Sequence, residues 1–125
     1  MKMFIKNLIK AFGHAIDGWE VGLRERNTKI HLIMSALVII LGVFFQISTT
    51  EWLVIIMLIG MVISAELFNT AIEEVCNIMN EKLKLQYSDT TFARDLAAGA
   101  VFIVACCSAL IGVIIFAPKV ITLLL

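Results

Sequence analysis

The first part of the chain repeats apolar residues with the period of an α-helix. Over residues 4–23 they recur every three or four positions, at Phe4, Leu8, Phe12, Ile16, Trp19 and Leu23. Charged residues fall largely elsewhere, and Lys2, Lys6 and Lys10 make the start of the segment basic. Such a helix lies in a membrane interface, with its aromatic face in lipid and its lysines near the headgroups. Packing on a soluble core is the alternative, but the rest of the chain offers no such core. We therefore predict that residues 1–29 form an interfacial amphipathic helix.

Three further segments are long and apolar enough to cross a bilayer. The predicted spans are residues 30–47, 52–76 and 95–117. Residues 48–51 are polar and are predicted to form a tight turn between the first two spans. Trp52 then begins the second span at the height where membrane proteins carry an aromatic belt.

The region between the last two spans is more polar. The second span is expected to continue as an amphipathic helix to about Asn80, and residues 81–93 are predicted to form a loop. Thr90 or Thr91 is a suitable cap for the following helix. Pro118 is expected to end that helix, because proline lacks the backbone donor that a helix interior needs.

The composition indicates that these helices form an all-α integral membrane protein. The chain has 125 residues, of which 61% are hydrophobic and 16% are charged. A soluble chain of this length could not bury so much apolar surface. The net charge is zero and no basic patch stands out, which argues against nucleic acid as a partner. The three cysteines show no C-x-x-C spacing and are interpreted as core or lipid-facing residues.

The distribution of Lys and Arg predicts the orientation in the membrane. Residues 1–29 carry six of these side chains and residues 82–94 carry three, whereas the 48–51 turn carries none. Basic segments face the cytoplasm. We therefore expect a cytoplasmic N-terminus, an external 48–51 turn, a cytoplasmic 81–93 segment and an external C-terminus.

Polar side chains form a stripe where the second span reaches the cytoplasmic side. Glu66 lies 14 residues after Trp52, about 21 Å along a helix, in the inner half of a hydrocarbon layer of about 30 Å. Asn69 and Glu73 follow at helical spacing on the same face, and Thr70 and Asn77 extend it. A carboxylate at the depth of Glu66 costs roughly 2.5–3.5 kcal/mol on insertion scales. Its presence indicates a functional site at the membrane surface.

The other two spans bring further charged residues to the same level. Glu25 precedes the first span, and Arg94 and Asp95 precede the third. Carboxylate oxygens suit Mg²⁺ together with phosphate, and a positioned carboxylate can deprotonate a hydroxyl. These residues therefore suit phosphoryl transfer to a lipid alcohol. Spacing alone leaves two alternatives open: polar contacts that associate helices, and a non-enzymatic oligomeric conduit for ions or protons. The chain lacks both common glycine-rich phosphate-binding patterns, so any ATP site has to be built from helix side chains.

The same residues resemble a known family, the prokaryotic diacylglycerol kinase and undecaprenol kinase family of small membrane lipid kinases. Residues 66–73, Glu-Leu-Phe-Asn-Thr-Ala-Ile-Glu, resemble its E-x-x-N-[ST]-A-I-E signature. Residues 94–101, Arg-Asp-Leu-Ala-Ala-Gly-Ala-Val, are similar to the K-D-x-x-x-x-A-V opening of its last helix. Glu25-Arg26-Asn27 and Ile30-His31 support the resemblance, which covers nearly the whole chain.

The resemblance implies a mechanism and a role for each site residue. Glu66 would be the general base that takes the proton from the lipid hydroxyl, and Glu25 and Glu73 would bind the Mg²⁺ that bridges the ATP phosphates. Asn69 would form a hydrogen bond near the γ-phosphate, and Arg94 and Asp95 would contact the nucleotide, so that Glu25, Asn69, Glu73, Arg94 and Asp95 make up the ATP site. Arg94 stands where the family usually has Lys, an exchange of a point charge for a planar fork.

The resemblance also implies the surroundings of the enzyme. It would be a homotrimer in the bacterial inner membrane, with sites shared between subunits, acting on undecaprenol or diacylglycerol. Asn27, Ile30 and His31 are more similar to the undecaprenol kinase branch, but both lipids present a primary hydroxyl at the interface.

Overall fold

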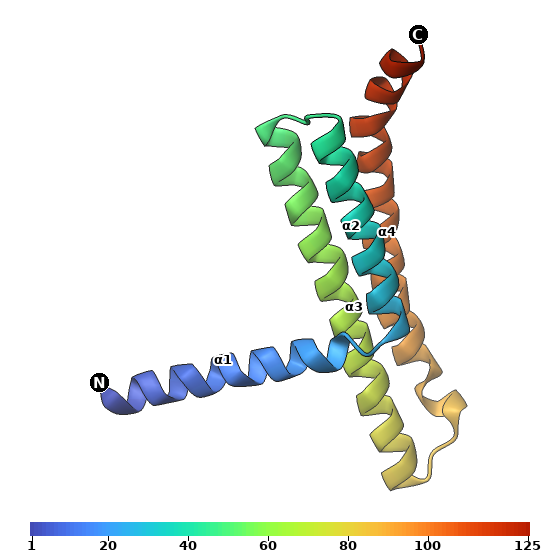
Figure 1. The fold of residues 1–125 in the computed structure, drawn as a ribbon. Helices are drawn as coiled ribbons and strands as arrows, with labels where there is room; N and C mark the ends of the chain where they lie inside the picture. The colour runs from blue at the N-terminus through green and yellow to red at the C-terminus, as the bar shows by residue number, and fades with distance from the viewer.

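The computed structural model describes residues 1–125 as four α-helices without a β-strand. They are α1 (Lys2–Gly22), α2 (Arg26–Phe44), α3 (Thr49–Leu83) and α4 (Tyr87–Leu124). Figure 1 shows α2, α3 and α4 side by side as a bundle, with α1 projecting sideways from it. The last three helices are each long and apolar enough to cross a membrane. The predicted all-α membrane fold is therefore confirmed.

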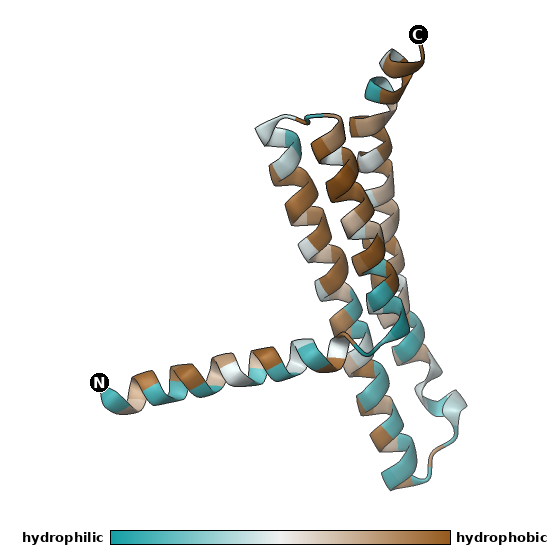
Figure 2. Ribbon diagram, in the orientation of Figure 1, coloured by the Kyte–Doolittle hydropathy of each residue, from teal (hydrophilic) through white to brown (hydrophobic).

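Helix α1 is amphipathic and almost wholly exposed. Figure 2 shows hydrophobic and hydrophilic residues alternating along it. Phe4, Phe12 and Ile16 are all more than half exposed, as expected for side chains that lie in lipid. Gly22, in contrast, is buried against Leu67 of α3. This contact fixes the end of α1 beside the middle of α3.

The turn between α2 and α3 is shorter than the sequence indicates. Helix α3 begins at Thr49, so the expected 48–51 turn is wrong: Ser48 is the N-cap and Glu51 lies in the first helical turn. The Ser48 hydroxyl accepts from the Glu51 backbone N–H at 3.3 Å, and Glu51 Oε2 accepts from the Ser48 backbone N–H at 2.7 Å. This reciprocal pair is a capping box. Lys119 of α4 forms an ion pair of 3.1 Å with Glu51, tying α4 to the same end of the bundle.

Helices α3 and α4 extend well beyond the membrane as a pair. Their 35 and 38 residues correspond to about 52 and 57 Å, against a hydrocarbon thickness of about 30 Å. Figure 2 shows hydrophilic residues gathering on the part of both helices that lies beyond the α1–α2 connection. The predicted 81–93 loop is wrong, because only residues 84–86 separate the two helices.

Two unusual caps explain this short connection. Lys84 ends α3 in the left-handed conformation, with φ of 52°. Gln86 is the N-cap of α4, and its backbone N–H donates to Asp89 Oδ2 at 2.8 Å. Thr90 and Thr91, the predicted caps, lie inside the helix.

Pro118 does not end α4, which continues to Leu124. Proline removes one backbone hydrogen bond, and helices in membranes tolerate that loss. In Figure 1 the ribbon changes direction over this last part of α4.

The bundle buries little of its own surface. Only 14 of 125 residues are buried, with a small apolar core of Ile47, Ile55 and Ile115. Most apolar side chains point outward, so the bundle requires a covering of lipid or protein.

Candidate functional site

The polar stripe predicted from the sequence lies on α3. Glu66 and Asn69 are buried, with 3% and 5% of their surface exposed, and Glu73 is exposed one turn further on. Asn69 Nδ2 donates to Glu73 Oε1 at 3.0 Å, while Asn69 Oδ1 is buried without a partner. The Asn69 amide therefore orients the Glu73 carboxylate, and Glu73 Oε2 stays free for a ligand.

The Glu66 carboxylate has no hydrogen bond or ion pair within the chain, although it is nearly fully buried. Its neighbour Leu67 contacts Gly22, so the end of α1 is at the level of Glu66. A buried carboxylate normally has a partner, because desolvation is otherwise uncompensated. The Glu66 carboxylate is thus free to accept a hydrogen bond from a ligand or from water.

An apolar cavity begins one helical turn from Glu66. Val62, four residues before Glu66 and on the same face of α3, lines it together with residues of α2 and α4. Its volume is about 720 Å³, and its polar lining consists of His31, Ser35 and Ser108. Both hydroxyls donate to backbone carbonyls of their own helices, at 2.7 and 2.8 Å. The cavity is therefore suited to a hydrocarbon chain.

Glu25 is the N-cap residue of α2, but its side chain does not cap the helix. The side chain is exposed and has no ion-pair partner. Within one chain, no group of three or more His, Cys, Asp or Glu side chains could hold a metal ion.

Arg94 is buried between α3 and α4. Its Nε donates to Thr90 Oγ1 at 3.2 Å and its Nη2 donates to Asn77 Oδ1 at 3.0 Å. The guanidinium also lies over the ring of Tyr87, 4.7 Å from its centroid. Sequence reasoning missed Thr90 as a partner of Arg94; the i, i+4 spacing of the two on one helix was the available signal.

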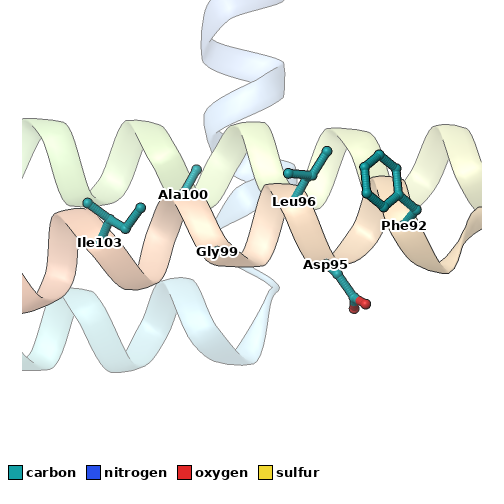
Figure 3. A pocket seen from close by; sticks show the side chains of 6 residues that line it. All are labelled: Phe92, Asp95, Leu96, Gly99, Ala100 and Ile103. Carbon is teal, nitrogen blue, oxygen red and sulfur yellow. The ribbon is translucent and has the colours of Figure 1, made fainter.

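Asp95 lies apart from Arg94, although the two are adjacent in sequence. Figure 3 shows its carboxylate pointing away from α3, at the edge of a hollow on α4. That hollow, of about 380 Å³, is otherwise lined by Phe92, Leu96, Gly99, Ala100 and Ile103. Successive helical residues point about 100° apart, so Arg94 and Asp95 serve different faces of α4.

The site thus joins two environments along α3. Glu66 lies one helical turn from Val62, which lines the apolar cavity, whereas Glu73 and Asn77 follow along α3 and Arg94 of α4 donates to Asn77. An amphiphile with its reactive headgroup near Glu66 would meet a water-soluble, anionic co-substrate there.

Comparison with known proteins identifies the family of this chain. The sequence profile of the family described as prokaryotic diacylglycerol kinase matches residues 13–116. Over 116 residues the chain is 39% identical to undecaprenol kinase of Bacillus subtilis (strain 168), an alignment that covers 92% of each protein. The comparison with solved structures found no match. The chain therefore belongs to the prokaryotic diacylglycerol kinase family, whose members are membrane lipid kinases.

Proposed function

We propose that this protein transfers the γ-phosphate of ATP to the primary hydroxyl of a membrane lipid alcohol. The observation that carries the proposal is Glu66, a buried carboxylate without a partner in its own chain and one turn from an apolar cavity. The hydrocarbon part of the lipid would lie in the cavity, and its hydroxyl would meet Glu66.

Glu66 acts as the general base. It accepts the proton of the lipid hydroxyl while the hydroxyl oxygen bonds to the γ-phosphorus, and the bond from that phosphorus to the β–γ bridging oxygen breaks. ADP leaves and the lipid carries the phosphate, so the transfer is direct and in line.

Mg²⁺ suits the donor groups of this site. Glu73 has a free carboxylate oxygen, Asn69 Oδ1 is an unpartnered buried amide oxygen, and Glu25 has an unpaired carboxylate. Oxygen ligands of this kind, completed by phosphate oxygens and water, are those that Mg²⁺ prefers. Glu25 and Glu73 would bind the ion, which neutralises charge on the phosphates when bound.

Arg94 and Asp95 contact the nucleotide in this proposal. Arg94 supplies a cation on the polar extension, where it donates to Asn77, four residues after Glu73 on α3. Because Asp95 points away from α3, a second copy of the chain would complete the nucleotide site on that face. This requirement supports an oligomer with shared sites, and the family resemblance implies that it is a homotrimer.

Undecaprenol is the proposed lipid, in preference to diacylglycerol. The support is the 39% identity to a protein named undecaprenol kinase. The proposed location is the bacterial inner membrane with a cytoplasmic N-terminus, because the basic residues gather on that side.

A label-transfer assay tests the proposal. The purified protein in mixed micelles receives ATP radiolabelled at the γ-phosphate, with undecaprenol and diacylglycerol in equal amounts. We expect magnesium-dependent labelling, mainly of undecaprenol. Preferential labelling of diacylglycerol would contradict undecaprenol as the substrate. Labelling of neither lipid would contradict the proposed kinase activity.

A further inference from the structure

The Arg94 guanidinium is a largely buried cation whose hydrogen-bond and ring partners are all neutral. The residue is 8% exposed, and its contacts are the Asn77 amide oxygen, the Thr90 hydroxyl and the Tyr87 ring. The two ion pairs of the chain involve other residues. A buried charge is costly unless an opposite charge accompanies it. The arrangement therefore leaves the cation available to an anion from outside the chain.

The guanidinium still has hydrogen-bond donors to offer that anion. An arginine carries five N–H donors, and the bonds to Thr90 and Asn77 use two of them. Three remain without a partner in the chain. Arginine binds phosphate through two parallel N–H donors, so the free donors suffice for one bidentate contact.

Thr90 is the centre of the network that fixes this guanidinium. Its hydroxyl accepts from Arg94 Nε at 3.2 Å and from Asn80 Nδ2 at 3.1 Å, and it donates to the Tyr87 carbonyl at 3.2 Å. One donated and two accepted bonds are the full capacity of a hydroxyl. Because the residue is only 6% exposed, water cannot readily replace these bonds.

We infer that Thr90 and Asn77 are positioning residues that hold the Arg94 guanidinium for a phosphate of the nucleotide. The inference rests on the proposed function and deepens it. Thr90 anchors Arg94 from its own helix, and Asn77 anchors it from α3, the helix that also carries Glu66 and Glu73. Both anchors are neutral, so neither competes with phosphate for the charge of Arg94.

Neighbouring Thr91 provides a matched control. Its hydroxyl donates only to the Tyr87 carbonyl at 3.1 Å and does not contact Arg94. Thr90→Val and Thr91→Val therefore make the same chemical change one residue apart, inside and outside the network. Thr90→Ser keeps the hydroxyl, and Asn77→Ala removes the second anchor independently.

The test measures KM for MgATP, KM for the lipid alcohol and kcat of each full-length variant in mixed micelles, together with its thermal unfolding. We expect Thr90→Val and Asn77→Ala to raise KM for MgATP about tenfold, the effect of about 1.4 kcal/mol of lost phosphate binding. The KM for lipid should stay unchanged, and Thr90→Ser and Thr91→Val should behave as wild type.

Two results would overturn the inference. One is an unchanged KM for MgATP in both Thr90→Val and Asn77→Ala. The other is a fall in kcat that follows lost thermal stability, with no selective change in KM for MgATP, which would identify a purely structural link between α3 and α4. Arg94→Ala separates this inference from the proposed function. If Arg94→Ala binds MgATP normally, the proposed contact of Arg94 with the nucleotide is wrong as well. If Arg94→Ala raises KM for MgATP but Thr90→Val and Asn77→Ala do not, only the positioning role of Thr90 and Asn77 is wrong.

Discussion

Gly22 at the end of α1 packs directly against the side chain of Leu67 on α3, one residue beyond Glu66. A Cβ at position 22 would meet the Leu67 δ-methyl group, so glycine lets the two helices approach this closely without displacing the Leu67 side chain. The interfacial helix and the stripe of polar residues are thereby joined at one contact.

Gly22→Ala should therefore destabilise the protein by about 1–3 kcal/mol, the usual cost of overpacking, and lower kinase activity by displacing α3 near Glu66. Gly18→Ala is the control, because a Cβ there meets nothing within 4 Å. It should leave stability unchanged or raise it by up to about 1 kcal/mol through helix propensity. Thermal unfolding in detergent micelles measures both; equal behaviour of the two variants would contradict the packing role of Gly22.

Ser48→Ala tests whether the far end of the bundle serves stability alone. Loss of the capping box should cost about 0.5–2 kcal/mol of stability. Glu51 lies 15 residues before Glu66, about 22 Å along α3, so KM and kcat of the folded protein should not change. Thr49→Ala, which removes no capping bond, is the control. A fall in kcat without a change in thermal stability would show that this end takes part in the reaction.

Glu73→Gln tests the proposed metal site. The amide keeps the shape of the side chain but removes the charge that would bind Mg²⁺, so the half-saturating Mg²⁺ concentration should rise by on the order of 10-fold. Glu74→Gln makes the same change at the next position, which is also exposed and lies off the stripe. The same half-saturating Mg²⁺ concentration in wild type and Glu73→Gln would show that Glu73 does not bind the metal.

The spans and the stripe of polar residues were predictable because periodicity and hydropathy carry them. The stripe at Glu66, Asn69 and Glu73 needs only helical spacing. The short connection was not predictable, since Lys84 and Gln86 occupy cap positions for which other residue types are preferred. The prediction that Pro118 ends the last helix was also wrong, because helices in membranes tolerate a proline that would end many helices of soluble proteins.

The surroundings of Arg94 and Asp95 could not be predicted from the sequence either. The family resemblance implied that Arg94 and Asp95 both contact the nucleotide, but neighbouring residues of a helix point about 100° apart, and Asp95 points away from α3. The contact of Arg94 with Asn77 depends on the register of α4 against α3, which becomes known only once the three-residue connection is placed. Contacts between helices thus required the structure, whereas contacts along one helix followed from spacing.

The initial rate of Glu66→Gln, measured with MgATP and undecaprenol in mixed micelles, tests the central claim most directly. Glutamine preserves the shape of the side chain but cannot accept the hydroxyl proton. A general base typically contributes 10²–10⁴-fold, so we expect the rate to fall by at least about 100-fold while KM for MgATP stays near that of wild type. Lipid phosphorylation by Glu66→Gln at the wild-type rate would contradict the assignment of Glu66 as the base.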